Sequence, residues 1–238
     1  MPDKATHSAF RTWLIWTFLS HSCYSYARFQ GVGLAHSMIP VLSQLPEEER
    51  RRALSEYVEP FNCEPNLAQV LVGAMARMEQ AGGGTKARRL KSTASASLSG
   101  VGDSLTQAGV GPFALSVALM CALSGYVQSA FWYAVFMSLA VWCLGGFLFS
   151  FGYRHGVGAI RRVMNGSVQA VISAGSAAGA LVVSGALASR YTEVSSFHPA
   201  VALSVLAFSY ICLRRGLRPA QVAAVIFGAS VIASSLLH

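Results

Sequence analysis

Five long apolar runs fill most of the chain after residue 105 and restrict its fold more than any other feature. Each is long enough, or nearly so, to cross the hydrocarbon core of a bilayer, which takes roughly 20 residues of helix. The composition agrees, because 53% hydrophobic and 12% charged residues in a chain of 238 are unusual for a water-soluble domain. We therefore predict an all-α integral membrane protein with about five transmembrane helices. The runs are 108–125, 127–151, 168–189, 198–213 and 219–237.

Positive charges fall in alternate breaks between these runs and indicate the orientation of the chain. Lys and Arg concentrate in the cytoplasmic loops of membrane proteins, so the basic breaks are placed in the cytoplasm. The charge-poor break near Gly125 and the one that holds Glu193 then fall outside. We predict a multi-pass membrane protein with a cytoplasmic amino terminus. The basic residues concerned are Lys86, Arg88, Arg89, Lys91, Arg154, Arg161, Arg162, Arg214, Arg215 and Arg218.

The net charge of +8 also raises the question of a nucleic-acid partner. The Lys and Arg residues lie beside apolar runs and form no basic stripe interleaved with aromatic residues. Contact with anionic membrane lipid therefore explains them better, and no nucleic acid is expected.

Residues 1–80 alternate polar and apolar stretches and are predicted to form amphipathic and re-entrant helices. The run 13–19 is too short to span a bilayer, and its aromatic rings suit an amphipathic helix at the interface. The stretch 24–45 is apolar but keeps several polar side chains, so we expect a helix buried against protein or lining a wet cavity. The charged stretch 47–52 favours an exposed helix. The apolar spacing of 66–80 favours another helix.

Residues 81–97 hold a glycine run followed by basic residues and are predicted to be a flexible cytoplasmic linker. The spacing of a phosphate-binding loop is absent. Gly100 and Gly102 permit a tight turn, so a turn is expected at 98–105. A transmembrane bundle would then occupy 98–238.

Cysteine and histidine usage gives no sign of a metal or redox site. The five cysteines and six histidines include neither a C-x-x-C pair nor an H-E-x-x-H motif. No nucleophile elbow or pair of carboxylates occurs in an intact local context either. We expect no cofactor, no metal and no catalytic residue.

Six short blocks occur in the order typical of one family of membrane proteins. They are Ala-Arg-Phe-Gln-Gly-Val-Gly-Leu-Ala (27–35), Phe-Asn-Cys-Glu-Pro-Asn-Leu-Ala (61–68), Leu-Val-Gly-Ala-Met-Ala-Arg-Met-Glu (71–79), Leu-Ser-Gly-Val-Gly-Asp-Ser-Leu (98–105), Phe-Gly-Tyr-Arg-His-Gly (151–156) and Gly-Ala-Leu-Val-Val-Ser-Gly-Ala-Leu-Ala-Ser (179–189). Together they resemble the IID membrane subunit of the mannose/fructose/sorbose-type sugar phosphotransferase system (PTS). The resemblance covers nearly the whole chain.

This resemblance implies a hetero-oligomer of the bacterial inner (plasma) membrane in which the chain and a IIC membrane subunit form the pathway for a hexose-type sugar. It also implies that soluble IIA and IIB proteins carry the phosphoryl group on their own histidines, and that IIB phosphorylates the sugar. The IID subunit itself would then be non-catalytic.

Three polar side chains in the matching blocks are candidates for sugar contact: Gln30, Asn62 and Glu64. Amides and carboxylates can exchange hydrogen bonds with several hydroxyls. Each has a structural alternative, which is an inter-helix hydrogen bond for Gln30, a turn between two prolines for Asn62 and a helix cap for Glu64. Asp103 and Ser104 are further candidates, and either can instead cap a helix that follows the predicted turn.

A second hypothesis is a non-transporting membrane scaffold or receptor with the same fold. The chain is shorter than is usual in the family, and Cys63 stands where the family usually has threonine. A scaffold would tolerate replacement of Gln30, Asn62 and Glu64 while its assembly with partners persists.

Overall fold

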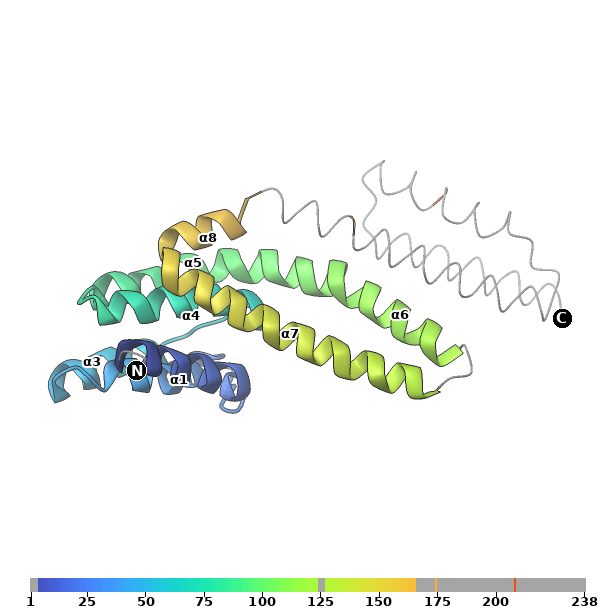
Figure 1. Ribbon diagram of the computed structural model, residues 1–238. Helices are drawn as coiled ribbons and strands as arrows, with labels where there is room; N and C mark the ends of the chain where they lie inside the picture. The colour runs from blue at the N-terminus through green and yellow to red at the C-terminus, as the bar shows by residue number, and fades with distance from the viewer. Residues whose placement is uncertain (1–3, 124–126, 166–173, 175–207, 209–238) are drawn as a thin grey trace, which may run out of the picture. The chain divides into compact units, whose positions relative to one another are not determined.

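The computed structural model describes residues 4–123, 127–165, 174 and 208 (Figure 1). All the helices named here lie in one compact unit, Met1–Ala180, and the second unit is Leu181–His238. Within the described residues the regular elements are helical, and extended pairing is limited to isolated bridges. The helices are α1 (Lys4–Leu19), α2 (Gly31–Leu42), α3 (Glu47–Val58), α4 (Pro65–Gln80), α5 (Gly84–Asp103), the π-helix η1 (Ser104–Val110), α6 (Gly111–Leu123), α7 (Val127–His155) and α8 (Val157–Val163).

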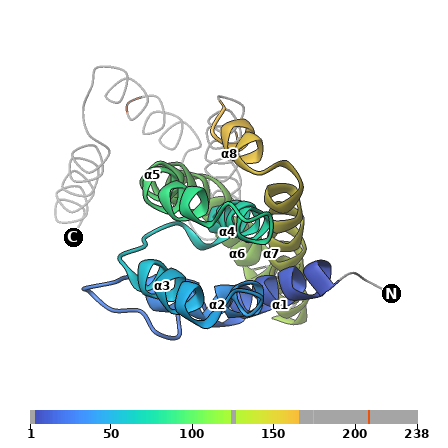
Figure 2. The same cartoon turned by 90° about the vertical axis from the view of Figure 1, so that its left-hand side faces the viewer.

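Two layers of helices build the amino-terminal part of this unit. Figure 2 shows α1, α2 and α3 in one layer and α4 and α5 in the other, with α7 beside α4. Apolar side chains from both layers fill the space between them, and burial of this apolar surface stabilises the arrangement. The most buried large side chains include Trp16, Leu34, Met38, Leu71 and Met75.

Helix α2 is enclosed by protein, which confirms one of the two predictions for the stretch 24–45. Nine of its 12 residues are buried, and at about 1.5 Å per residue it is too short to cross a bilayer. Glycine lets neighbouring backbone come close, because a Cβ at Gly31 would meet the carbonyl oxygen of Glu59. The helix is shorter than predicted, since Phe29 has a positive φ of 49° just before it begins.

Residues 84–123 are helical throughout, which corrects the predicted flexible linker at 81–97 and the predicted turn at 98–105. Four residues of α5 recur at helical spacing and are buried against the rest of the unit. That buried face outweighs the low helix propensity of Gly100 and Gly102. The helix widens only after this stretch, in the π-helix η1, where the Gly111 N–H donates to the carbonyl of Thr106 five residues earlier. These four residues are Ala87, Lys91, Ala94 and Leu98, and the buried Gly102 continues the same face.

Helix α7 contains Gln128–His155, which is long and apolar enough to cross a membrane and has a mean hydropathy of 2.0 over an 18-residue window. It corresponds to the predicted run 127–151, and the run 108–125 corresponds to parts of η1 and α6. Apart from the single residues 174 and 208, the remaining three runs, 168–189, 198–213 and 219–237, lie outside the described residues. The count of about five transmembrane helices therefore stays a prediction.

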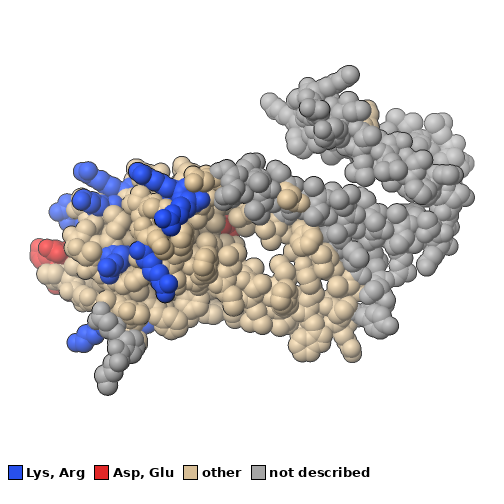
Figure 3. Space-filling model, turned by 45° about the horizontal axis from the view of Figure 1, so that its top comes forward, with Lys and Arg blue, Asp and Glu red and all other residues tan. Residues whose placement is uncertain are grey.

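Charge is concentrated at one end of this unit. Figure 3 shows Lys and Arg side chains gathered over the end that carries α3 and α8. No charged residue occurs between Asp103 and Arg154, so η1, α6 and most of α7 are free of charge. Large apolar side chains are exposed there instead, as expected of a surface that faces lipid. They include Phe131, Trp132, Phe136 and Trp142.

Candidate functional site

A short backbone bridge joins the two blocks that carry Gln30 and Asn62. The N–H of Gln30 donates to the carbonyl of Phe61 at 2.9 Å, and the N–H of Phe61 donates to the carbonyl of Arg28 at 3.2 Å. The segment before α2 and the segment before α4 therefore lie side by side. This brings the candidate residues of both segments to one place.

Gln30 connects the two segments through its side chain as well. Its side chain is buried, and Oε1 accepts from the N–H of Cys63 at 3.1 Å. Its Nε2 lies 3.4 Å from Nε2 of His21. The amide oxygen is thus used to fix the segment that carries Asn62. The bond joins two segments that precede helices, rather than two helices as the structural alternative for Gln30 had it.

Glu64 caps the start of α4, which is the structural alternative predicted for it. Its Oε2 accepts from the N–H groups of Asn66 and Leu67 at 3.0 and 2.8 Å, and its Oε1 accepts from Nδ2 of Asn66 at 2.9 Å. A carboxylate is favoured at a helix start because free N–H groups and the helix dipole both attract it. Pro65 occupies the first position of the helix, where its missing N–H costs nothing.

Asn62 differs from its two neighbours because its side chain is exposed. Within the described part of the chain its amide makes no hydrogen bond. The backbone on both sides of it is fixed, by Phe61 in the bridge and by Cys63 on Gln30. Asn62 therefore presents two donors and one acceptor from a rigid position.

Asp103 and Ser104 lie inside a continuous helical path, which corrects their predicted role as caps. Ser104 Oγ donates to the carbonyl of Gly100 at 2.8 Å, and Asp103 Oδ2 accepts from Ser99 Oγ at 3.3 Å. Both residues are exposed. The caps were expected because glycines around an Asp-Ser pair are typical of a turn, but the buried face of α5 keeps this stretch helical.

The end of α5 nevertheless reaches the segment that Gln30 holds. A Cβ at Gly102 would collide with Cβ of Glu64, so the two backbones are close. Burial chiefly raises the pKa of Cys63 to about 12, and the charges of Glu64 and Asp103 raise it further. The Cys63 thiol is therefore neutral at physiological pH. All the segments that carry candidate residues thus meet near Cys63.

A small polar pocket beside this cluster contains residues that sequence reasoning missed. Its volume is about 130 Å³, and the buried Gln69 is one of its walls. Gln69 Nε2 donates to Thr17 Oγ1 at 3.2 Å, while its Oε1 has no partner among the described residues. The feature of the sequence that could have indicated this pocket is a glutamine on the apolar face of α4. The other lining residues are Trp16, Ser20, His21, Pro65, Asn66, Val141 and Trp142.

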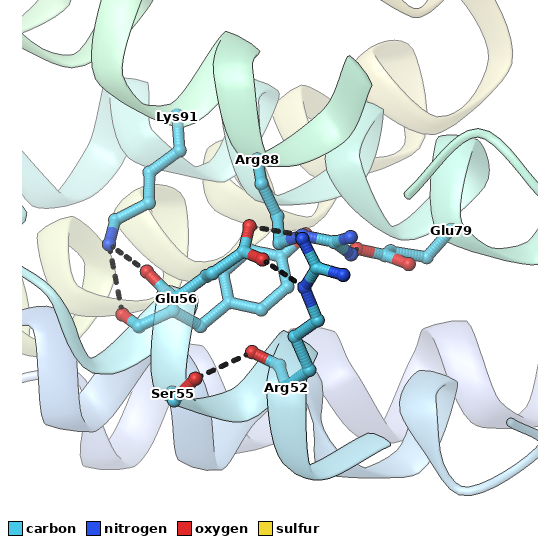
Figure 4. A network of polar contacts seen from close by, with 7 residues as sticks. Arg52, Ser55, Glu56, Glu79, Arg88 and Lys91 are labelled. Atoms are coloured by element: carbon cyan, nitrogen blue, oxygen red, sulfur yellow. Dashed lines mark hydrogen bonds and ion pairs between the residues drawn. The ribbon is translucent and has the colours of Figure 1, made fainter. Parts of the chain in front are cut away.

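A second polar cluster joins α3, α4 and α5 at the charged end (Figure 4). Tyr57 Oη donates to Glu79 Oε1 at 2.8 Å, and Arg88 forms ion pairs with Glu79 at 3.0 Å and Glu56 at 2.6 Å. Burial chiefly, with Glu79 beside it, raises the pKa of Tyr57 well above its ordinary value, so its hydroxyl remains a donor. This network satisfies buried charges and fixes three helices.

A helical unit with one charged end and a long apolar helix is the architecture of a membrane protein. Two solved structures share the fold, each at 19% sequence identity and each covering 97% of this chain and 96% of the other chain. One is a membrane protein, with a TM-score of 0.69. The other is the complex of the mannose transporter ManYZ with microcin E492, with a TM-score of 0.58.

The chain belongs to the mannose/fructose/sorbose family of the PTS, as a IID component, because the model of that family matches residues 4–205. This confirms the family predicted from the six blocks and makes the chain a sugar-transport membrane protein. The mannose-specific EIID component of the PTS of Escherichia coli K12 is 26% identical over 201 residues, which cover 81% of this chain and 71% of the relative. The fructose permease IID component of Bacillus subtilis is 24% identical over 180 residues, which cover 72% of this chain and 65% of the relative.

Proposed function

We propose that this chain forms, with a IIC subunit, a hexose pathway through the bacterial inner membrane, and that a IIB protein phosphorylates the sugar after a IIA protein has supplied the phosphoryl group. The observation that carries the proposal is the exposed amide of Asn62, which has no hydrogen-bond partner among the described residues and is held next to Gln30 and Glu64. The charged end of the unit, which includes Arg154, is then cytoplasmic.

Sugar recognition needs donors and acceptors that are already in place, because ordering them on binding would cost affinity. In this cluster Gln30 and Glu64 hold the backbone, and Asn62 contacts the sugar. The exposed carboxylate of Asp103 provides a further acceptor, and the hydroxyl of Ser104 can still accept. The pocket lined by Asn66 and Gln69 extends the polar surface around the same segment.

Phosphorylating uptake tests this function directly. The chain is co-expressed with IIC, IIA and IIB proteins, and accumulation of labelled hexose phosphate is measured in membrane vesicles. Asn62→Ala is expected to lower uptake about tenfold, the effect of losing one or two hydrogen bonds to the sugar, while co-purification with IIC is unchanged. Asn165→Ala is the matched control, because Asn165 is exposed and lies outside the cluster.

Two outcomes would contradict the proposal. Equal uptake by the Asn62→Ala and Asn165→Ala variants would show that Asn62 does not contact the sugar. Absence of uptake with every soluble protein present, together with intact assembly with IIC, would instead support the non-transporting scaffold.

A further inference from the structure

A groove with a volume of about 470 Å³ lies between the first helix of the chain and the end of α7. Aromatic rings form its walls, and one cation stands at its edge. The rings are Phe10 and Trp13 of α1 and Phe149 and Tyr153 of α7, and the cation is Arg154.

The walls of this groove are held in place by contacts outside it. Tyr153 Oη donates to Gln80 Oε1 at 2.6 Å, and the guanidinium of Arg77 lies 5.7 Å from the centre of the Tyr153 ring. Phe149 is only 5% exposed. At Gly146 a Cβ would come within 3.2 Å of the Trp13 ring, so the glycine allows that ring to lie against α7. The groove is therefore preformed.

Arg154 gives the groove a positive charge that no described residue neutralises. Arg154 is exposed and makes no ion pair or hydrogen bond within the described part of the chain. No carboxylate lines the groove. An anionic group at this edge would therefore meet a guanidinium that has no competing partner, and guanidinium binds phosphate oxygens well.

With α7 placed across the bilayer, as its length and apolarity allow, the apolar and charged ends of the groove lie at different depths. Arg154 is in the last turn of the apolar stretch Gln128–His155, where a helix reaches the headgroup region. Phe149 lies five residues earlier, about 7.5 Å deeper at 1.5 Å per residue. The groove thus offers rings at the depth of acyl chains and a cation at the depth of headgroups.

We propose that this groove binds one anionic phospholipid of the cytoplasmic leaflet, with an acyl chain against the rings and the phosphate on Arg154. A sugar fits it less well, because most of the wall offers no hydrogen bond to hydroxyl groups and a sugar has no long apolar chain to cover the rings. The anionic lipids of that leaflet supply both parts of the required chemistry.

Native mass spectrometry of the full chain in detergent tests this site with two lipids of identical acyl chains, phosphatidylglycerol and phosphatidylcholine. The chain is expected to retain one phosphatidylglycerol about tenfold more strongly than phosphatidylcholine, because both lipids carry the phosphate but the choline ammonium of phosphatidylcholine cancels its charge and repels the guanidinium. Arg154→Gln is expected to remove this preference. Arg161→Gln, which neutralises an exposed arginine of α8 outside the groove, is expected to keep it.

A second variant tests the apolar part without removing charge. Ser150→Trp fills the groove from an exposed position and is expected to abolish retention of both lipids, with unchanged thermal stability. Excess inorganic phosphate is not expected to displace the lipid, and displacement would mean a phosphate site instead. Equal retention of the two lipids, or equal losses in the Arg154→Gln and Arg161→Gln variants, would overturn the proposal. So would crosslinking of a photoreactive residue at position 150 to a protein subunit rather than to lipid.

Discussion

Replacing Gly152 with alanine is expected to destabilise the protein by about 3 kcal/mol, the upper end of the cost of overpacking. The reason is a close crossing of α4 and α7. A Cβ at Gly152 would meet the backbone carbonyl of Val70, and a Cβ at Gly73 would meet that of Phe149. Because the obstacles are backbone atoms on two packed helices, neither helix can make room without moving away from the other. Small residues permit such close helix contacts in membrane proteins.

Thermal unfolding of the purified chain in detergent measures this effect. For a chain of this size a loss of about 3 kcal/mol corresponds to roughly 6–12 °C in Tm. The matched control is Gly158→Ala in α8, where an added Cβ meets no atom within 4 Å. There alanine is expected to be neutral or to stabilise by up to about 1 kcal/mol through its higher helix propensity. If both variants had the same Tm, the α4–α7 contact would not be as close as described.

The sequence predicted well those elements whose signal is local. Apolar spacing placed a helix at 66–80, where α4 runs from Pro65 to Gln80, and the charge order of 47–52 placed the exposed α3. The cap formed by Glu64 was also available from the sequence, because an acid directly before a proline that begins a helix lies next to the free N–H groups of that helix. The partner of Gln30 was not, because Cys63 is 33 residues away in the sequence.

The sequence predicted poorly those features that depend on distant neighbours. Glycines in 98–105 indicated a turn, but the face of α5 that begins at Ala87 is buried and keeps the stretch helical. The crossing at Gly73 and Gly152 joins two distant parts of the chain, and neither glycine alone shows which backbone it meets. Gln69 was missed because one glutamine in an apolar helix face does not reveal the polar pocket beside it.

Replacing Lys91 with methionine is expected to destabilise the protein by about 3 kcal/mol, because buried carbonyls would lose a charged donor. Lys91 is 4% exposed, and its Nζ donates to the carbonyls of Glu56, Tyr57 and Glu59 at 2.8, 3.1 and 2.8 Å. These carbonyls lie at the end of α3, where the C=O groups of the last turn have no N–H donor within the helix and the dipole favours a cation. Methionine keeps the apolar stem but donates nothing.

The measurement is again Tm at pH 7. Burial lowers the pKa of Lys91 to about 8, so most of the population is still an ammonium with three donors at this pH. Lys86→Met is the matched control, because Lys86 lies on the same helix, is exposed and makes no side-chain hydrogen bond or ion pair within the described residues. A loss of roughly 6–12 °C is expected for Lys91→Met alone. Equal Tm values for the two variants would mean that Lys91 does not cap α3, and that the α3–α5 contact depends on Arg88 and its two carboxylates instead.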